Sequence, residues 1–319
     1  MSTDPELFPL SVADAQPIAR DIFRFELRDP QGSELPAFTA GAHLTLRVPS
    51  GALRKYSLCN DPAERERYVI AVRREADGRG GSVSLADGVH PGDTLEASAP
   101  RNDFELHPRA NNFLFIAGGI GITPILAMVR HLQSSGRGRF KLVYLTRDRE
   151  SAAFADELEA PEFHGKVRIH HDGGDPARAF DLWPLLERPS GAHVYCCGPR
   201  ALMDAVRDMS GHWPGGSVHF ESFGASAALN RQNRPFTARL AKSGLTLAVP
   251  ADATLLDVIR AAGIQVPSSC ESGTCGSCKT VVLAGEAEHR DFVLTEEERG
   301  DRIMVCCSRA VSPELVLDL

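Results

Sequence analysis

The chain has 319 residues, of which 43% are hydrophobic and 24% charged, an ordinary composition for a soluble globular protein. One hydrophobic core rarely serves a chain of this length, so about two or three domains are expected. The formal net charge of −7 argues against nucleic-acid binding, which relies on clustered lysines and arginines.

The N-terminus "MSTDPELFPL" has neither the basic nor the apolar region of a secretory signal. The uncharged run 111–129 is interrupted by glycines and Pro124, which favours a buried strand, a glycine turn and a helix over a membrane span. With no export signal, we expect a cytoplasmic protein whose eight cysteines are reduced or metal-bound.

The first third of the chain predicts β-strands. Apolar and polar residues alternate in 21–29 and 42–49, and 67–75 is apolar and β-branched in its middle. Turns rich in Gly, Pro and Asp separate these runs. Short strands at this spacing are typical of an antiparallel barrel or sandwich.

From residue 112 the pattern changes to strands that alternate with helices. The continuous apolar run 111–119 is typical of a parallel strand covered on both faces. The helix that follows has Thr123 as its expected N-cap and Pro124 as its first residue. Further strands are expected at 140–147, 166–171 and 192–198, with helices at 151–160, 182–187 and 200–210. This alternation predicts βαβ units and a parallel sheet.

Around residues 222–235 the chain turns small and polar, as in a linker. Beyond it we expect strands at 236–244, 246–251, 279–287 and around 302–310, with a helix at 254–263. A small mixed α+β domain with a helix over a sheet is predicted.

The segment "CESGTCGSCKT" places Cys270, Cys275 and Cys278 at the C-x4-C-x2-C spacing of plant-type [2Fe–2S] proteins, which need a distant fourth cysteine. Cys306 and Cys307 are both available. Adjacent strand residues face opposite ways, so only one of the two can be a ligand, and alternation alone does not choose. Zinc sites usually use C-x2-C pairs, and only one such pair is present in this loop.

Three further motifs suit cofactors. "AGGIGITP" joins a strand to a helix start, where free N–H groups favour anions, although it is not G-x-G-x-x-G. "CCGP" repeats this arrangement at a later strand end. In "RKYSL", Arg54 offers a fork for a phosphate or carboxylate, Tyr56 a flat face and Ser57 a hydroxyl. Tight turns and a surface arginine are the alternative explanations.

The chain carries, in this order, "RKYSL", "GRGGS", "PRNDFEL", "AGGIGITP", "CCGP" and "CESGTCGSC". Over nearly its whole length it resembles the phthalate dioxygenase reductase family, within the ferredoxin–NADP reductase superfamily. The vanillate demethylase reductases are a near neighbour. The resemblance implies an FMN-binding antiparallel β-barrel at 1–109, an NAD-binding α/β domain with a parallel sheet at 110–224, a linker at 225–235 and a β-grasp ferredoxin domain at 236–319.

The resemblance also implies a flavin site. Arg54 is expected at the FMN phosphate, and Tyr56 and Ser57 at the ribityl chain and ring. The remaining expected flavin contacts are the backbone at Ala71 and Val72 and the phosphate cradle Gly80, Gly81 and Ser82. FMN is favoured over FAD because no separate stretch that would clasp an adenosine is evident.

The same resemblance implies a nicotinamide site beside the flavin. Thr123, Cys197 and Phe223 are the candidate catalytic residues: Thr123 where the glycine loop meets the flavin, Cys197 beside the nicotinamide and Phe223 near the isoalloxazine. The other expected nucleotide contacts are Gly118, Gly119, Gly121, Gly198 and Pro199, with Arg147 and Asp172 at the ribose or adenine. In this family the fourth cluster ligand precedes x-S-R-A, which selects Cys306 and turns Cys307 away from the cluster.

The function implied is electron transfer. NADH would give a hydride to FMN, and electrons would leave singly through the [2Fe–2S] cluster to a terminal Rieske-type oxygenase. One chain holds every centre needed, so a monomer suffices. The alternatives are the reductase of a related O-demethylase, a stand-alone flavin or ferric reductase, which needs no residues 236–319, and a zinc-binding protein without enzymatic activity, against which the flavin motifs count.

Overall fold

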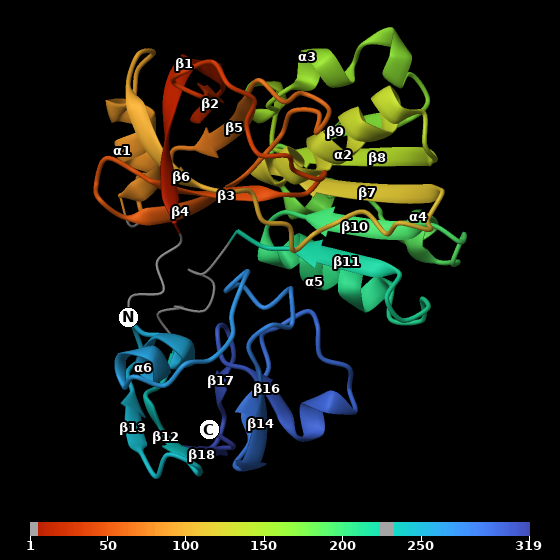
Figure 1. Cartoon of the computed structure of the whole chain (residues 1–319). Helices are drawn as coiled ribbons and strands as arrows, with labels where there is room; N and C mark the ends of the chain where they lie inside the picture. The colour runs from red at the N-terminus through yellow and green to blue at the C-terminus, as the bar shows by residue number, and fades with distance from the viewer. Residues whose placement is uncertain (1–5, 79, 224–232) are drawn as a thin grey trace. The chain divides into compact units, whose positions relative to one another are not determined.

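The computed structural model describes residues 6–78, 80–223 and 233–319. The chain forms two compact units, which divide between His219 and Phe220 (Figure 1). Unit 1 contains a β-barrel and a parallel sheet, and unit 2 contains a small mixed sheet with one α-helix. None of the described helices is long and apolar enough to cross a membrane.

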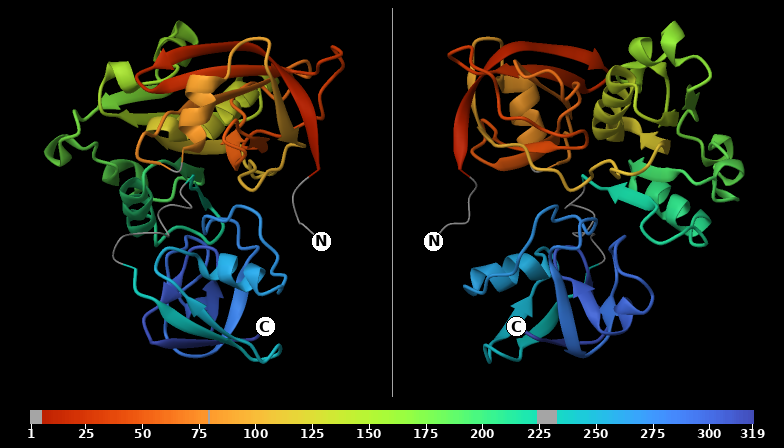
Figure 2. Two further views of the ribbon diagram at one scale, coloured as in Figure 1. Left: turned by 90° about the vertical axis from the view of Figure 1, so that its left-hand side faces the viewer. Right: turned by 45° about the vertical axis from the view of Figure 1, so that its right-hand side comes forward.

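The first part of unit 1 is a closed antiparallel barrel (Figure 1, Figure 2). Its strands, in the spatial order β4-β3-β6-β1-β2-β5, are β1 (Leu7–Ala19), β2 (Ile22–Arg28), β3 (His43–Arg47), β4 (Leu53–Ser57), β5 (Tyr68–Arg73) and β6 (Thr94–Ser98). Just past β4, Leu58 pairs with Ile70 of β5, and the Cys59 N–H donates to the Val69 carbonyl at 2.8 Å. This pairing joins the two edge strands, so the predicted barrel, rather than the sandwich, is confirmed.

Helix α1 (Gly81–Gly88) packs its fully buried Leu85 into the barrel core. The sequence analysis did not predict this helix. Its neighbour β5 carries Ala71 and Val72, so α1 and the predicted flavin strand lie side by side.

The second part of unit 1 is the predicted parallel sheet, in the order β11-β10-β7-β8-β9. Its strands are β7 (Asn112–Gly118), β8 (Arg139–Thr146), β9 (Val167–His171), β10 (His193–Cys197) and β11 (Val218–Glu221). Its helices are α2 (Ile122–Ser135), α3 (Ala155–Leu158), α4 (Trp183–Leu186) and α5 (Arg200–Met209). The chain proceeds from β7 through β8 to β9 on one side and then places β10 on the other side of β7. Ligands in such sheets bind at this reversal, beyond the carboxyl ends of the strands.

Strand β7 is buried on both faces, as its sequence predicted. Phe113, Phe115 and Ala117 share a core cluster with the buried side of α2. Leu114 and Ile116 point to the opposite face and are also buried.

Two helix predictions need correction. Helix α2 begins at Ile122 with Gly121 at its N-cap, so Thr123 is not the cap but a buried residue of the first turn. The helix expected at 151–160 is reduced to α3, because Phe154 takes the left-handed conformation (φ 60°) directly before it.

Unit 2 has a five-stranded sheet in the order β13-β12-β18-β14-β16. Its elements are β12 (Phe236–Leu240), β13 (Thr246–Val249), α6 (Leu255–Ala261), β14 (Lys279–Ala284), β16 (Arg302–Met304) and β18 (Glu314–Leu317), with a separate pair, β15 (Ala287–Glu288) and β17 (Arg309–Ala310). The pairing of β12 with β18 is parallel and the other described pairings are antiparallel. Leu255, Leu256 and Ile259 of α6 pack into the core, which agrees with the predicted β-grasp arrangement.

Short 3-10 helices complete the described chain: η1 (Gly119–Gly121), η2 (Arg149–Ser151), η3 (Pro161–Phe163), η4 (Pro176–Arg178) and η6 (Glu298–Gly300). The prediction of one continuous strand around 302–310 is wrong in the middle of that segment. Strand β16 ends at Met304, and the N–H groups of Cys307 and Ser308 both donate to the Met304 carbonyl in a tight turn.

Stacked rings hold the edge of the parallel sheet. His107 stacks on His193 with ring centroids 4.3 Å apart, and Tyr195 stacks on His219 at 4.4 Å. The ring nitrogens of His193 and His219 are 3.1 Å apart. Burial, and then the neighbouring imidazoles, lower the pKa of His219 to about 4, so His219 is neutral near pH 7.

This stack predicts a pH dependence of stability. Since the pKa of His219 falls from its ordinary 6.5 to about 4 on folding, the unfolded chain binds the proton more readily between these values. The stabilisation is complete above about pH 6.5 and is lost as the pH falls toward 4. His219→Phe keeps a stacked ring and should flatten the dependence of thermal unfolding on pH in this window, whereas His164→Gln, at an exposed position, should not. An unchanged slope in His219→Phe would contradict this assignment.

Candidate functional site

Arg54 lies against the N-terminus of α1, an arrangement suited to an anion. A Cβ on Gly81, the first residue of α1, would lie 2.6 Å from the Arg54 Nε, so the guanidinium packs directly on the helix start. No side chain caps α1, and Gly80 precedes it with a φ of 76°. A guanidinium beside free helix N–H groups is the donor set that a phosphate needs. The residues therefore fit the phosphate of a flavin nucleotide.

The other predicted flavin residues lie on β4, on β5 and at the start of α1. Burial raises the pKa of Tyr56 to about 12, against the opposing effect of Arg54, so its phenol stays protonated and can donate a hydrogen bond. Ser57, Ala71 and Val72 are buried. The Ser82 hydroxyl accepts a hydrogen bond from the Glu75 N–H at 3.1 Å, which ties the start of α1 to the chain that leaves β5.

The glycine loop lies at the point where the sheet order reverses. A Cβ on Gly121 would lie 2.2 Å from the Cys197 carbonyl oxygen, and a Cβ on Gly118 would lie 2.7 Å from Pro199 Cδ. A Cβ on Gly198 would in turn lie 3.0 Å from the Gly118 Cα. Only glycine permits this close approach, so the structure brings the two predicted nucleotide motifs together, at the start of α2.

The three predicted catalytic residues have different surroundings. Thr123 is 2% exposed and its hydroxyl donates to the Ile120 carbonyl at 3.1 Å. Cys197 is fully buried, and its carbonyl rather than its thiol is the group that meets the glycine loop. Phe223 follows β11 and is 46% exposed. Their catalytic roles stay predictions.

Arg147 and Asp172 lie together at the carboxyl ends of β8 and β9. The Gly173 N–H donates to the Arg147 carbonyl at 2.7 Å, and the Asp172 N–H donates to the Thr146 carbonyl at 3.1 Å. The Asp172 carboxylate accepts from the Gly174 N–H at 2.7 Å. They share the sheet edge with the glycine loop, as contacts to one dinucleotide require.

One small apolar cluster joins the flavin strand to the glycine loop. Ala71 of β5 packs with Ile22 and Ala153, and Ile120 and Phe154 pack against them. The predicted flavin and nucleotide sites therefore meet inside unit 1.

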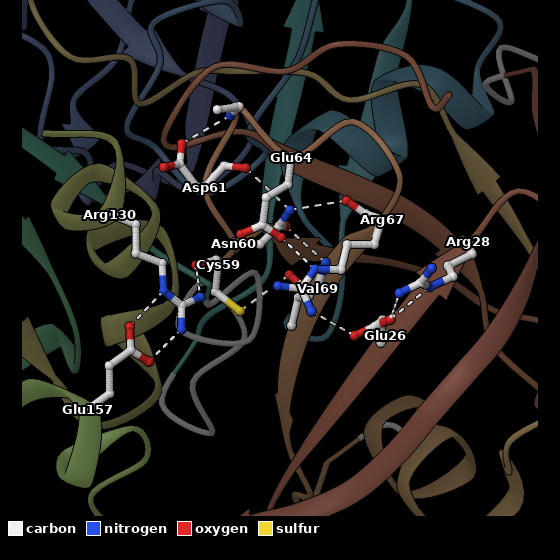
Figure 3. A network of polar contacts seen from close by, with 11 residues as sticks. Glu26, Arg28, Cys59, Asn60, Asp61, Glu64, Arg67, Val69, Arg130 and Glu157 are labelled. Carbon is white, nitrogen blue, oxygen red and sulfur yellow. Dashed lines mark hydrogen bonds and ion pairs between the residues drawn. The ribbon is translucent and has the colours of Figure 1, made fainter. Parts of the chain in front are cut away.

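Arg130 of α2 also joins the barrel to the α/β part of unit 1 (Figure 3). Its guanidinium donates to the Cys59 carbonyl of the barrel at 2.6 Å and pairs with Glu157 of α3, with Nε 2.8 Å from the carboxylate. Sequence reasoning missed this residue, because an arginine on a helix gives no sign of a partner 71 positions away.

The network continues from Cys59 into the barrel (Figure 3). The Asn60 side chain accepts from the Val69 N–H at 2.9 Å and donates to the Arg67 carbonyl at 3.1 Å. Arg67 pairs at 2.9 Å with Glu26, whose pKa the arginines hold below its usual range against the effect of burial. The barrel side of the contact is thus anchored by charge-assisted hydrogen bonds.

In unit 2 the four predicted cluster ligands lie near one another. The Cys270 N–H donates to the Cys275 sulfur at 3.4 Å, and the Cys278 side chain interacts with that of Cys306, which also interacts with that of Cys307. In the described chain no three His, Cys, Asp or Glu side chains surround a single metal position. Four cysteine thiolates are the ligand set of a plant-type two-iron cluster.

The backbone of the loop supports the same conclusion. The N–H groups of Ser272 and Thr274 both point at the Cys270 sulfur, at 3.4 Å each. The hydrogen bond from Cys275 and these donors lower the pKa of Cys270, which favours the thiolate that binds iron. The donor set therefore fits a [2Fe–2S] cluster.

Cys307 occupies a distinct position behind the loop. Because Cys306 and Cys307 lie in a turn, strand alternation does not separate them. A Cβ on Gly273 would lie 2.5 Å from the Cys307 sulfur, and Gly273 itself has a φ of 81°. The Gly273 carbonyl accepts from the Phe292 N–H at 2.9 Å. Cys307 thus packs against the loop backbone, and the choice of Cys306 as ligand stays a prediction.

Comparison with known proteins identifies both functional regions. Residues 9–106 match the family model described as an oxidoreductase FAD-binding domain, and residues 238–311 match the 2Fe-2S iron-sulfur cluster binding domain. The chain is 59% identical to the phthalate dioxygenase reductase of Burkholderia cepacia over 97% of each chain. It is 59% identical to the phthalate 4,5-dioxygenase oxygenase reductase subunit of Pseudomonas putida, covering 97% of this chain and 96% of that one.

A more distant relative and a solved structure extend this comparison. The vanillate O-demethylase oxidoreductase of Pseudomonas sp. is 40% identical, over 95% of this chain and 96% of its own. A solved structure of phthalate dioxygenase reductase, described as modular for electron transfer from pyridine nucleotides to [2Fe–2S], covers 98% of both chains with a TM-score of 0.76 and 58% identity. The predicted layout of flavin barrel, nucleotide sheet and ferredoxin fold is confirmed.

Gly121→Ala tests the close approach at the switch point. The added methyl would overlap the Cys197 carbonyl, so β7 and β10 must separate, at a cost of roughly 1–3 kcal/mol of stability. We expect weaker NADH binding and slower flavin reduction in stopped-flow experiments. Gly215→Ala is the control, because a Cβ there meets nothing within 4 Å. Wild-type kinetics in Gly121→Ala would remove this loop from the nucleotide site.

Cys306→Ser and Cys307→Ser test the fourth ligand. Cys306→Ser should lose or distort the cluster, because a hydroxyl replaces a thiolate in the pair with Cys278. Cys307→Ser should keep its iron content and visible absorption. The reverse outcome would make Cys307 the ligand.

Proposed function

The chain belongs to the phthalate dioxygenase reductase family, and we propose that it is the NADH-dependent reductase of an aromatic-ring oxygenase system. The observation that carries this proposal is the presence of two kinds of site in one chain. The glycine loop packs beside the predicted flavin strand in unit 1, and the four predicted cluster cysteines lie near one another in unit 2.

Bound FMN would accept two electrons together as a hydride and release them singly, and the cluster would carry one electron at a time. The residues of the chain hold these groups. Arg54 and the N-terminus of α1 would hold the flavin phosphate, and β5 with Ala71 and Val72 would lie along the flavin. The glycine loop, with Thr123 at the start of α2, would hold the nicotinamide nucleotide.

FMN, rather than FAD, is the flavin we propose, although the matching family model is described as FAD-binding. Arg54 and the N-terminus of α1 offer donors to a terminal phosphate, the group that FMN presents. Flavin released from the purified protein and analysed by mass spectrometry should be FMN. Recovery of FAD would overturn this choice.

The electron acceptor that we propose is a terminal Rieske-type oxygenase. The relatives at 59% identity are named for phthalate dioxygenase, whereas the vanillate O-demethylase relative is 40% identical, which favours a phthalate-type partner. We further propose a monomer in the cytoplasm, with functional domains at 1–109, 110–224 and 236–319 and a linker at 225–235. In supporting the reactions of separately purified phthalate and vanillate oxygenases, the chain should favour the phthalate enzyme.

The direct test of the function is the visible spectrum of the purified protein with flavin and iron assays. We expect flavin bands over broad iron–sulfur absorption, with about two irons per flavin. Anaerobic NADH should bleach both, and NADPH should do so far more slowly. Absence of either chromophore from reconstituted protein would contradict the proposal.

A further inference from the structure

Asp291 carries a carboxylate that is fully buried in unit 2, at 0% exposure. Its Oδ2 accepts hydrogen bonds from the N–H groups of Val293 and Leu294, at 3.1 and 2.8 Å. Because these two donors favour the ionised form of the carboxyl group, Asp291 brings a negative charge into the interior of unit 2. Burying a charge is unfavourable unless it is fully paired, so simple packing does not explain this residue.

The second oxygen of Asp291 is not fully paired. Asp291 Oδ1 and His289 Nδ1 are 3.7 Å apart, which is too far for a hydrogen bond, and neither buried atom has a hydrogen-bond partner in the described chain. The other ring nitrogen, His289 Nε2, lies 3.1 Å from the Arg299 carbonyl. A carbonyl oxygen only accepts, so a proton is assigned to Nε2. No hydrogen bond from His289 therefore neutralises the carboxylate.

The cluster loop lies directly against Asp291. A Cβ on Gly273 would lie 3.1 Å from the Asp291 Cα and 3.4 Å from its Cβ. Gly273 is two residues from Cys275 and three from Cys270, so its backbone lies within about 7 Å and about 11 Å of these predicted ligands. Inside a protein, a charge at such a distance still acts strongly on its neighbours.

One peptide group connects the chain at Asp291 to a ligand sulfur. The N–H of the next residue, Phe292, donates to the Gly273 carbonyl at 2.9 Å. The N–H of that same peptide group, which belongs to Thr274, points at the Cys270 sulfur at 3.4 Å. The peptide group is thus bonded at both ends, and hydrogen bonds in such a chain polarise one another. Nearby charge and hydrogen bonds to the sulfurs are what set the potential of an iron–sulfur cluster.

The rest of segment 291–294 also supports the loop. A Cβ on Gly276, between Cys275 and Cys278, would lie 3.3 Å from Val293 Cγ1. Leu294 is buried in the core of unit 2. The segment therefore packs behind the loop at both of its glycines, which fixes the distance from the Asp291 carboxylate to the predicted ligands.

From these contacts we propose that Asp291 lowers the midpoint potential of the cluster, because it holds a buried negative charge behind the cluster loop. This inference rests on the proposed function, in which the four cysteines hold a [2Fe–2S] cluster. Reduction adds one electron to the cluster, and a fixed negative charge nearby opposes this addition. A lower potential makes the reduced cluster a better donor of that electron to the oxygenase.

The test is a redox titration of the purified holoprotein, in which electron paramagnetic resonance follows the reduced cluster. Asp291→Asn keeps an oxygen that accepts from the Val293 and Leu294 N–H groups and removes the charge. We expect the equilibrium constant for cluster reduction to rise about tenfold, which raises the midpoint potential of this one-electron couple by about 59 mV. The iron content and the shape of the resonance signal should match those of the wild type.

The matched control is Glu297→Gln, which removes a carboxylate from an exposed position of the same unit, where water and salt screen the charge. Its midpoint potential should equal that of the wild type. A wild-type or lower potential in Asp291→Asn that retains its cluster would overturn the proposal.

A second variant covers the case in which Asp291→Asn loses its cluster. Asp291→Ser also removes the charge, and its hydroxyl can accept hydrogen bonds in the same turn. Its midpoint potential should likewise rise, and an unshifted value would overturn the proposal. Cluster loss in both variants would also overturn it, because Asp291 would then only support the fold of the loop.

The outcome with the wild-type protein separates this inference from the proposed function. Wild-type protein that lacks a reducible cluster contradicts the function itself. Wild-type protein with a reducible cluster, together with an unshifted potential in the Asp291 variants, contradicts only the role of Asp291.

Discussion

The contact of helix α2 with the barrel is the constraint on which the electron path of unit 1 depends. The helix has 14 residues and is about 21 Å long. At its start, Gly121 lies so close to the Cys197 carbonyl that no side chain fits. About 13 Å further along, Arg130 holds the same helix to the Cys59 carbonyl of the barrel and to Glu157. Because helix α2 is held at its start and again at Arg130, it fixes the position of the nucleotide loop relative to the flavin strand.

The chemistry of the Arg130 contact explains its strength. The guanidinium is largely desolvated, and Glu157 and a main-chain carbonyl satisfy it. Removing one member of such a group leaves an uncompensated charge, which costs more than replacing the whole pair by apolar residues. The Ala71 cluster adds an apolar contact on the same outer face of the flavin strand. Position, rather than any acid–base group, is what the protein adds to cofactor chemistry.

Sequence patterns predicted most of the architecture because its signals are local. The cysteine spacing, the apolar run of β7 and the glycine that ends the helix expected at 254–263 are all short-range features. Strand β1 was missed because Pro9 and Pro17 argue against a strand between two neighbours. Helix α1 was missed because glycines occupy both of its ends and its apolar face is a single leucine.

The parts of the site that the sequence did not predict depend on distant contacts. The role of Arg130 depends on a carbonyl 71 residues away. Strand periodicity also did not predict the turn at Met304, where two N–H groups donate to one carbonyl. Spacing identifies a ligand set only where the ligands are close in sequence. It therefore identified the three loop cysteines but could not choose the fourth ligand.

The sites in the two units together imply that electrons from NADH pass through a flavin to a cluster in the same chain. An anaerobic titration with NADH, counted by absorbance, tests it most directly. A flavin takes two electrons and a [2Fe–2S] centre one, so complete bleaching should need about 1.5 NADH per chain. An end point near about 1.0, with the iron–sulfur absorption still present, would show that electrons stop at the flavin and would contradict the account.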